Sequence, residues 1–127
     1  MGWIAFVTLL ALIEYMVIGF LVGQARGRYG VKPPAITGHE IFERYFRVHQ
    51  NTLEQLVVFL PALWLYGHFV GPRTGALLGA AFIVGRALYL RGYVEDPAKR
   101  ELGFAIGAAA SGILLVGALI GVVVAAF

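Results

Sequence analysis

The sequence has no cysteine and little charge. Without cysteine, the chain can form no disulfide and no thiolate metal site, and it offers no cysteine nucleophile. Charged residues make up 13% of its 127 residues and hydrophobic residues 60%. A soluble domain has about 25% charged and about 45–50% apolar residues. Because so few charges cannot form a hydrated surface, we expect an integral membrane protein rather than a water-soluble monomer.

Four stretches of the chain are nearly free of charge, and each approaches or exceeds the roughly 20 residues that cross a bilayer as a helix. We expect helical spans at approximately residues 3–24, 42–69, 74–91 and 102–126. These solid apolar runs lack the alternation of a membrane β-barrel, and lipid cannot satisfy the edges of an open sheet. The prediction is an all-α integral membrane protein, a four-transmembrane-helix bundle forming one domain over residues 1–127.

The basic residues between the spans predict the orientation in the membrane. The first loop and its flank carry five Lys or Arg residues and the third loop three, whereas the second loop carries Arg73 alone. The positive-inside rule therefore places loops one and three in the cytoplasm and both termini on the opposite side. The first span lacks a basic n-region and a cleavage site, so we expect it to be retained. Short loops favour a bacterial inner membrane, and basic residues that flank spans indicate no nucleic-acid partner.

A polar stripe runs along the second predicted span. Its residues are Arg44, Arg47, Asn51 and Glu54, which fall within an arc of about 80° at 100° per residue. Two guanidiniums, an amide and a carboxylate on one face can receive a zwitterion. Burying a charge such as that of Glu54 within the membrane costs roughly 2.5–3.5 kcal/mol of insertion free energy. Because a chain rarely bears that cost without a use for the charge, the position of Glu54 favours a functional site. The alternative is a structural ion pair of Glu54 or Glu14 with Arg86.

Further polar residues stand at the same predicted boundary. Arg86, Tyr89 and Tyr93 share one face of the third span, although tyrosine is common at membrane interfaces without any site. Arg100 is either a site residue or a snorkelling interfacial arginine, and it follows a turn in which Asp96 is expected to cap the fourth helix. His49 lies about 160° around the helix from Arg47, so we expect it to serve another neighbour, such as the next subunit.

Small residues recur at four-residue intervals, which is typical of helices that approach closely. Four thin helices enclose little interior, so the polar groups would be better housed between the subunits of a homo-oligomer. The histidines have no metal-ligand spacing, and no metal site is expected. The small residues are Gly71, Gly75, Gly79, Gly103, Gly107, Gly117 and Gly121.

Three segments together resemble the family of membrane-associated proteins in eicosanoid and glutathione metabolism, the MAPEG family, which includes microsomal glutathione transferases. They are PP-x-x-x-G, FERYFRVHQNTLEQLVVFLPALW and RALYLRGYVEDPAKR. The pattern E-R-x-x-R-x-x-x-N-x-x-E followed by R-x-x-Y-x-x-G-Y is specific, and the similarity extends over nearly the whole chain. The resemblance implies a homotrimer that binds glutathione, as co-substrate, between neighbouring subunits near the cytoplasmic side.

The resemblance also implies roles for five residues of the second and third spans. Arg47, Asn51 and Glu54 match the residues that hold the γ-glutamyl end of glutathione. Tyr89 and Tyr93 match the tyrosines that line the pocket.

Four further residues take their roles from the same resemblance. Arg26 matches a basic residue near the glycine carboxylate, and His49 matches a Gln or His that contributes there. Arg86 resembles an arginine of the third helix, and Arg100 aligns with the arginine assigned to thiolate stabilisation. A free thiol has a pKa of about 8.5 and is mostly protonated at neutral pH. A guanidinium beside the sulfur favours the charged, nucleophilic form.

Two departures from the family pattern bear on the activity. Gln55 stands where the leukotriene synthase of the family has a tyrosine, and Gly27 stands where that enzyme has a second arginine. We therefore expect general glutathione conjugation or peroxide reduction on hydrophobic electrophiles dissolved in membrane lipid. The alternatives are a non-catalytic lipid-binding scaffold, as in the lipoxygenase-activating protein, and a glutathione-dependent isomerase.

Overall fold

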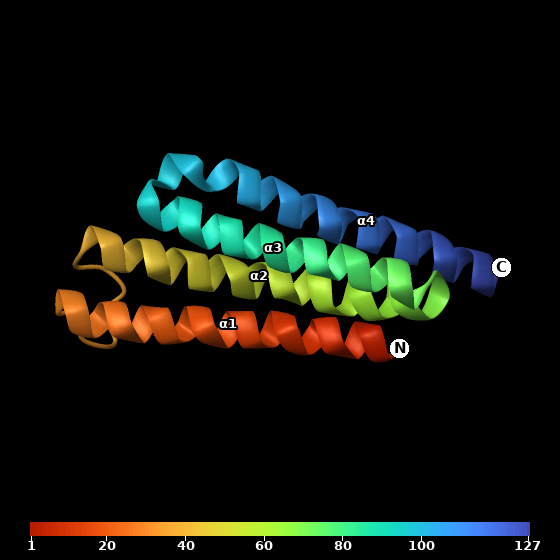
Figure 1. The fold of residues 1–127 in the computed structure, drawn as a ribbon, viewed down its shortest axis with the longest axis horizontal. Coiled ribbons are helices and arrows are strands. Elements are labelled where there is room, and N and C mark those ends of the chain that lie inside the picture. The colour runs from red at the N-terminus through yellow and green to blue at the C-terminus, as the bar shows by residue number, and fades with distance from the viewer.

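The computed structural model covers residues 1–127 and consists of four long α-helices lying side by side along one axis (Figure 1). They are α1 (Gly2–Tyr29), α2 (Glu40–Phe69), α3 (Pro72–Glu95) and α4 (Glu101–Ala126), with the short 3₁₀-helix η1 (Pro97–Arg100) before α4. The first loop and the η1 turn lie at one end of the molecule, and both termini lie toward the other (Figure 1). The all-α prediction is confirmed.

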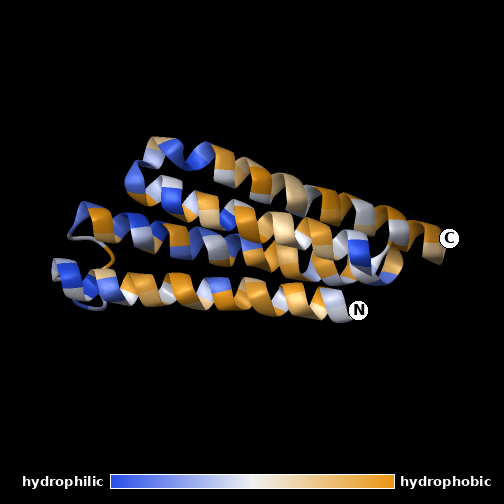
Figure 2. Ribbon diagram, in the orientation of Figure 1, coloured by the Kyte–Doolittle hydropathy of each residue, from blue (hydrophilic) through white to orange (hydrophobic).

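Three of the helical segments are long and apolar enough to cross a membrane: α1, α3 and the segment Pro97–Ala126. Helix α2 has 30 residues, but charged residues in its first half lower its hydropathy, and its crossing of the membrane stays a prediction. Hydrophilic residues gather at the end that carries the first loop and the η1 turn (Figure 2). Large apolar side chains remain exposed along α1 and α4, as expected for surfaces that face lipid.

Two helix boundaries differ from the prediction. Helix α1 continues beyond residue 24 through Arg26 and Arg28, and Gly30 ends it with a left-handed backbone at φ 68°. Assigning those arginines to the loop was wrong, because a helix that leaves the apolar layer can continue with charged residues until a glycine stops it. Helix α3 continues past residue 91 to Glu95. The prediction that Asp96 caps the fourth helix is wrong, because Asp96 caps η1 instead, its Oδ1 accepting a bond of 3.1 Å from the backbone N–H of Ala98.

The helices pack most closely where α3 crosses α4. A Cβ added at Gly85 would lie 2.7 Å from the backbone nitrogen of Gly107, so no larger residue fits at this crossing. Helices α2 and α3 each pack against both α1 and α4, and the rings of Phe59 and Phe82 stack between α2 and α3 at a centroid distance of 3.8 Å. Small residues of the predicted pattern therefore serve packing within one chain.

Candidate functional site

Arg86 is the largest fully buried side chain, with 1% of its surface exposed. Its Nη2 donates a hydrogen bond of 2.8 Å to Oγ1 of Thr52, which in turn donates to the carbonyl of Val48 at 2.7 Å. The guanidinium also lies over the ring of Tyr89, 4.2 Å from its centroid. Arg86 is therefore buried inside the subunit, where it contacts Thr52 and Tyr89. Its expected contact with a ligand stays a prediction.

The structural ion pair considered for Arg86 is not formed. The two ion pairs of the structure join Glu40 to Arg44 and Glu95 to Lys99. Sequence reasoning missed Thr52, the hydrogen-bond partner of Arg86. A threonine at a buried helix position is so common that its spacing alone carried no signal.

Three of the four stripe residues are unpaired on one face of α2. Arg47 and Glu54 are exposed and form no hydrogen bond or ion pair through their side chains. Asn51 between them is half-buried, and its Oδ1 is a buried acceptor without a partner. Most buried polar atoms of proteins are hydrogen-bonded, so an orphaned amide oxygen between an unpaired cation and an unpaired anion is unusual.

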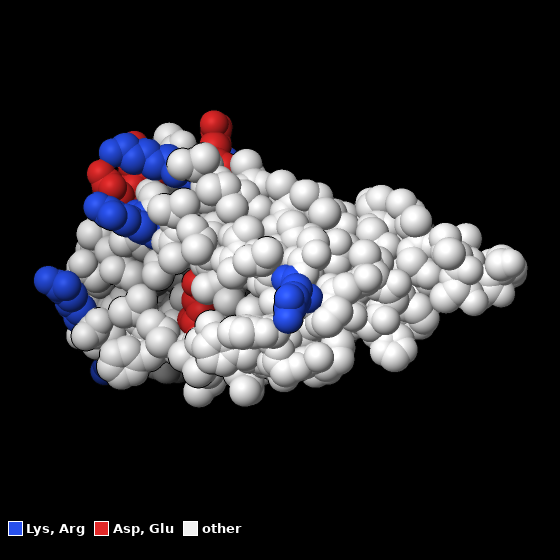
Figure 3. Space-filling model, turned by 45° about the vertical axis from the view of Figure 1, so that its right-hand side comes forward, with Lys and Arg blue, Asp and Glu red and all other residues white.

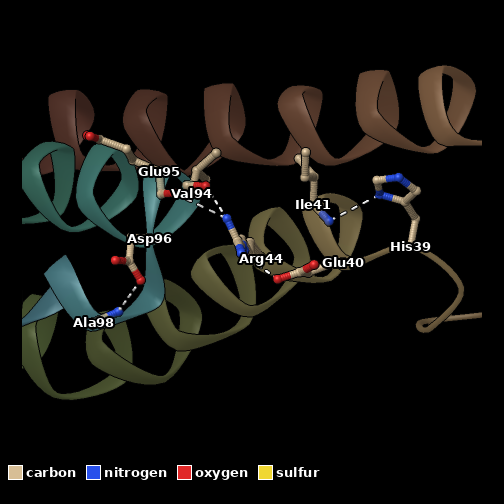
Figure 4. A network of polar contacts seen from close by, with 8 residues as sticks. All are labelled: His39, Glu40, Ile41, Arg44, Val94, Glu95, Asp96 and Ala98. Atoms are coloured by element: carbon tan, nitrogen blue, oxygen red, sulfur yellow. Dashed lines mark hydrogen bonds and ion pairs between the residues drawn. The ribbon is translucent and has the colours of Figure 1, made fainter.

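Arg44, the fourth stripe residue, leaves this face. Its Nη1 donates to the carbonyl oxygens of Val94 at 3.0 Å and Glu95 at 3.3 Å, and its Nη2 pairs with Glu40 Oε1 at 2.5 Å (Figure 4). The expectation that it joins the zwitterion receptor is wrong for this structure, because its Nη1 is engaged at the end of α3 and its Nη2 with Glu40, while its Nε is buried without a partner. Nearby, the hydrogen bond that Lys99 donates lowers the pKa of the exposed Glu95 carboxyl.

Two tyrosines of α3 pack in a cluster with Val48, the residue that follows Arg47 on α2. Tyr89 is 5% exposed, and its ring centroid lies 5.5 Å from that of Tyr93. The ring of Phe104 of α4 lies on another side of Tyr89, at a centroid distance of 6.2 Å. Of the predicted residues, the structure thus brings Arg86, Tyr89 and Tyr93 into contact, and the expected approach of Arg47 and Arg100 stays a prediction.

Arg100 lies exposed at the end of η1, where its Nη1 donates a hydrogen bond of 2.8 Å to the carbonyl of Pro97. Because this contact is with its own turn, the guanidinium is not held by another helix. Most of the basic and acidic side chains visible in Figure 3 gather at this end of the molecule, although one acidic patch and one basic side chain lie on its middle part. Arg100 is therefore placed at a charged rim beside the apolar body of the bundle.

The remaining two predicted residues are engaged elsewhere. The ring of His49 stacks on Tyr15 of α1, with centroids 4.5 Å apart and planes inclined by 8°. Arg26 donates through Nη1 to the carbonyl of Ala35 at 2.7 Å and lies over the ring of Phe42 at 4.8 Å. In one chain, His49 therefore contacts α1, and Arg26 orders the first loop. Their roles toward glutathione stay predictions.

Two hollows of the surface lie away from these polar residues. One, of about 530 Å³, lies between the first halves of α1 and α3 and includes Trp3 and Leu77. The other, of about 910 Å³, lies between α2 and α4 and includes Phe69 and Val116. Both are mainly apolar, so the polar residues form an open face of one chain rather than a lining of either hollow.

Comparison with known proteins identifies similar chains of comparable length. The sequence model of the MAPEG family matches residues 4–120. The chain is 51% identical to an uncharacterized protein of Synechocystis over 120 residues, 94% of this chain and 88% of that protein. It is 38% identical to human microsomal glutathione S-transferase 2 over 117 residues, 91% of this chain and 80% of that protein. It is 33% identical to rat leukotriene C4 synthase over 121 residues, 88% of this chain and 81% of that protein.

Proposed function

Because the chain belongs to the MAPEG family, we propose that it is a membrane-bound glutathione transferase that activates the glutathione thiol for attack on lipophilic electrophiles. The glutathione-related names of its relatives support this proposal. In it, α2 is the fourth membrane span. The first loop and the η1 turn face the cytoplasm of a bacterium whose inner membrane holds the protein, and both termini face the opposite side.

The observation that carries the proposal is the unpaired polar face of α2. Glutathione has a γ-glutamyl end with an ammonium group and a carboxylate on one carbon. In the proposal, Arg47 binds that carboxylate and Glu54 binds the ammonium group, because these are charge-assisted bonds of matching sign. Asn51 Oδ1, a buried acceptor without a partner, accepts a further hydrogen bond from the ammonium group or a peptide N–H.

The rest of the tripeptide reaches toward the loops. Tyr89 and Tyr93 line the pocket beside the stripe. In the proposal, Arg26 and His49 serve the glycine end and are supplied by the neighbouring subunit, because within one chain their side chains contact the first loop and α1 and not the stripe. We therefore include a homotrimer with the site between subunits as part of the proposal.

The chemistry centres on the thiol and Arg100. A free thiol has a pKa of about 8.5, and a guanidinium beside the sulfur stabilises the thiolate against protonation. The thiolate forms a carbon–sulfur bond with the electrophile, whose leaving group departs with the electron pair. With a lipid hydroperoxide, the same thiolate attacks the terminal oxygen, the O–O bond breaks, and the lipid alkoxide leaves with the electron pair and takes up a proton to become the alcohol. A second glutathione then attacks the sulfur of the resulting sulfenic acid, and the disulfide forms with loss of water.

The experiment is conjugation of chlorodinitrobenzene by the purified protein in mild detergent, with and without glutathione. We expect glutathione-dependent product and a glutathione-dependent rise in the unfolding temperature, because a ligand that binds only the folded state stabilises it. A protein that forms no product and shows no thermal shift is instead a lipid-binding scaffold. Cross-linking in the same detergent tests the trimer, and a yield of monomer alone contradicts it.

A further inference from the structure

The end of α3 is held from α2 by Arg44. Its Nη1 donates to the carbonyls of Val94 and Glu95, which lie 50 and 51 positions later in the chain and are the last two of α3 (Figure 4). The last four carbonyls of a helix have no partner within it, and a cation there complements the negative end of the helix dipole. Arg44 thus ties the end of α3 to α2.

The guanidinium that makes these bonds is itself anchored. Glu40, one turn earlier in α2, pairs with Nη2 at 2.5 Å, and the side chain of Arg44 is 20% exposed against 78% for Glu40. The planar fork of arginine can meet a carboxylate and two carbonyls at once, whereas the single ammonium of lysine cannot reproduce that geometry. The contact is therefore specific for arginine and not only for a positive charge.

A short and well-bonded turn connects those carbonyls to Arg100. Asp96 Oδ1 accepts from the backbone of Ala98 at 3.1 Å, and the carbonyl of Asp96 accepts from the backbone of Lys99 at 2.7 Å. Arg100 then bonds to the carbonyl of Pro97 at 2.8 Å. Because these bonds join the residues between Asp96 and Arg100, we expect a movement at the end of α3 to displace Arg100 as well.

We propose that Arg44 is a positioning residue that sets the place of Arg100 and so controls how strongly the thiol ionises, without contacting glutathione. The inference rests on the proposed function, in which Arg100 stabilises the thiolate and Arg47 binds the γ-glutamyl end. Arg44 and Arg47 lie one turn apart on α2. Arg47 therefore holds the glutathione peptide, and Arg44 holds the turn that carries Arg100. Because both side chains belong to α2, the helix keeps the peptide and the turn at a constant separation.

The test compares Arg44→Gln with Arg91→Gln, which removes the same charge from an exposed residue at the same end of α3 that makes no side-chain hydrogen bond. We expect Arg44→Gln to lower kcat at neutral pH about tenfold and to move the pH–rate profile about one unit to the alkaline side. The KM for glutathione should change less than about twofold, as for a group that acts only on the reacting sulfur. Arg91→Gln should leave all three quantities unchanged.

Two further variants separate positioning from charge and from folding. Arg44→Lys should resemble Arg44→Gln, because the fork is lost although the charge remains. In the background of Arg100→Ala, Arg44→Gln should cause no further shift of the pH profile or of the ultraviolet absorbance of the bound thiolate, since residues that act as a unit are not additive. If Arg44→Gln does not fold, Glu40→Gln removes only the anchor and should cause a smaller shift in the same direction.

Three outcomes would overturn the inference. In the first, adding Arg44→Gln to Arg100→Ala shifts the pH–rate profile as much as Arg44→Gln does in the wild type. In the second, Arg44→Gln raises the KM for glutathione and leaves the pH–rate profile unchanged. In the third, Arg44→Gln has the same kcat, KM and pH–rate profile as Arg91→Gln. If the wild-type protein conjugates nothing to glutathione, or if Arg100→Ala leaves the profile unchanged, the proposed function has failed. If the wild type and Arg100→Ala behave as expected and only Arg44→Gln does not, this inference alone has failed.

Discussion

The Nη2 atom of Arg86 donates a hydrogen bond of 2.8 Å to Oγ1 of Thr52, and both side chains are closed to the surroundings, with 1% of each exposed. This contact joins α3 to α2 in the middle of the bundle. A buried charge is tolerated only where hydrogen bonds or an opposite charge compensate its lost solvation. Thr52 and the facing ring of Tyr89 therefore compensate part of this cost, and Arg86 Nε remains a buried donor without a partner.

Replacing Thr52 by valine should destabilise the fold. The change keeps the shape of the side chain but leaves Arg86 Nη2 without its acceptor, at an expected cost of about 1–3 kcal/mol. The measurement is the unfolding midpoint in a mixed-detergent titration. Thr74→Val, at an exposed threonine, is the matched control and should leave the midpoint unchanged. Equal midpoints for the two variants would show that the buried bond contributes nothing.

Replacing Arg100 by alanine should change the pH dependence of conjugation. The guanidinium holds the pKa of the bound thiol low, so its removal raises that pKa and reduces the thiolate fraction at every pH below it. We expect a loss of about tenfold in kcat at neutral pH for each unit of the shift, recovered as the pH rises above the new pKa. An unchanged profile removes Arg100 from the mechanism.

Replacing Asn51 by alanine should weaken glutathione binding. The orphaned Oδ1 is expected to accept a hydrogen bond from the ligand, and its loss should raise the Kd about tenfold, the equivalent of about 1.4 kcal/mol. Isothermal titration with the non-reactive S-methyl derivative of glutathione measures the Kd apart from the chemistry. Gln50→Ala removes the adjacent exposed amide and should bind as the wild type does. A Kd equally raised in both variants argues against a specific contact.

Replacing Gly85 by alanine should force α3 and α4 apart. The new Cβ would lie 2.7 Å from the backbone nitrogen of Gly107, and backbone cannot move aside as a side chain can, so we expect a loss of about 1–3 kcal/mol. Gly112→Ala, whose Cβ would meet nothing within 4 Å, should be neutral or slightly stabilising because alanine favours helix. Unfolding midpoints of the two variants in the same detergent compare them directly, and a tolerated Gly85→Ala contradicts the close crossing.

The sequence predicted the helices well and their ends less well. The long apolar runs indicated α1, α3 and α4 because the interior of a membrane allows only helices or closed barrels. The ends were harder to place because a helix stops where its backbone finds a cap, which here is Gly30 for α1. We placed the loop at Arg26 from the charged residues that begin there. Those charges mark the edge of the apolar layer of the membrane, which is not the same position as the end of the helix.

The candidate site was predicted in part. The face shared by Arg47, Asn51 and Glu54 follows from the period of a single helix, and the structure leaves these three unpaired on α2. Arg44 has the same periodicity, yet it turns to the end of α3. Nothing local to α2 distinguishes it from Arg47, because the carbonyls that receive it come from another helix.

By itself, the sequence determined that the chain is a membrane protein built of helices, because composition and helical period are local properties that need no knowledge of the fold. Only the tertiary structure decided which polar groups meet. It paired Arg86 with Thr52 and Arg44 with the end of α3, and it left Asn51 unpaired. These partners depend on the register and rotation of one helix against another, which are set by how closely small residues such as Gly85 let the helices pack.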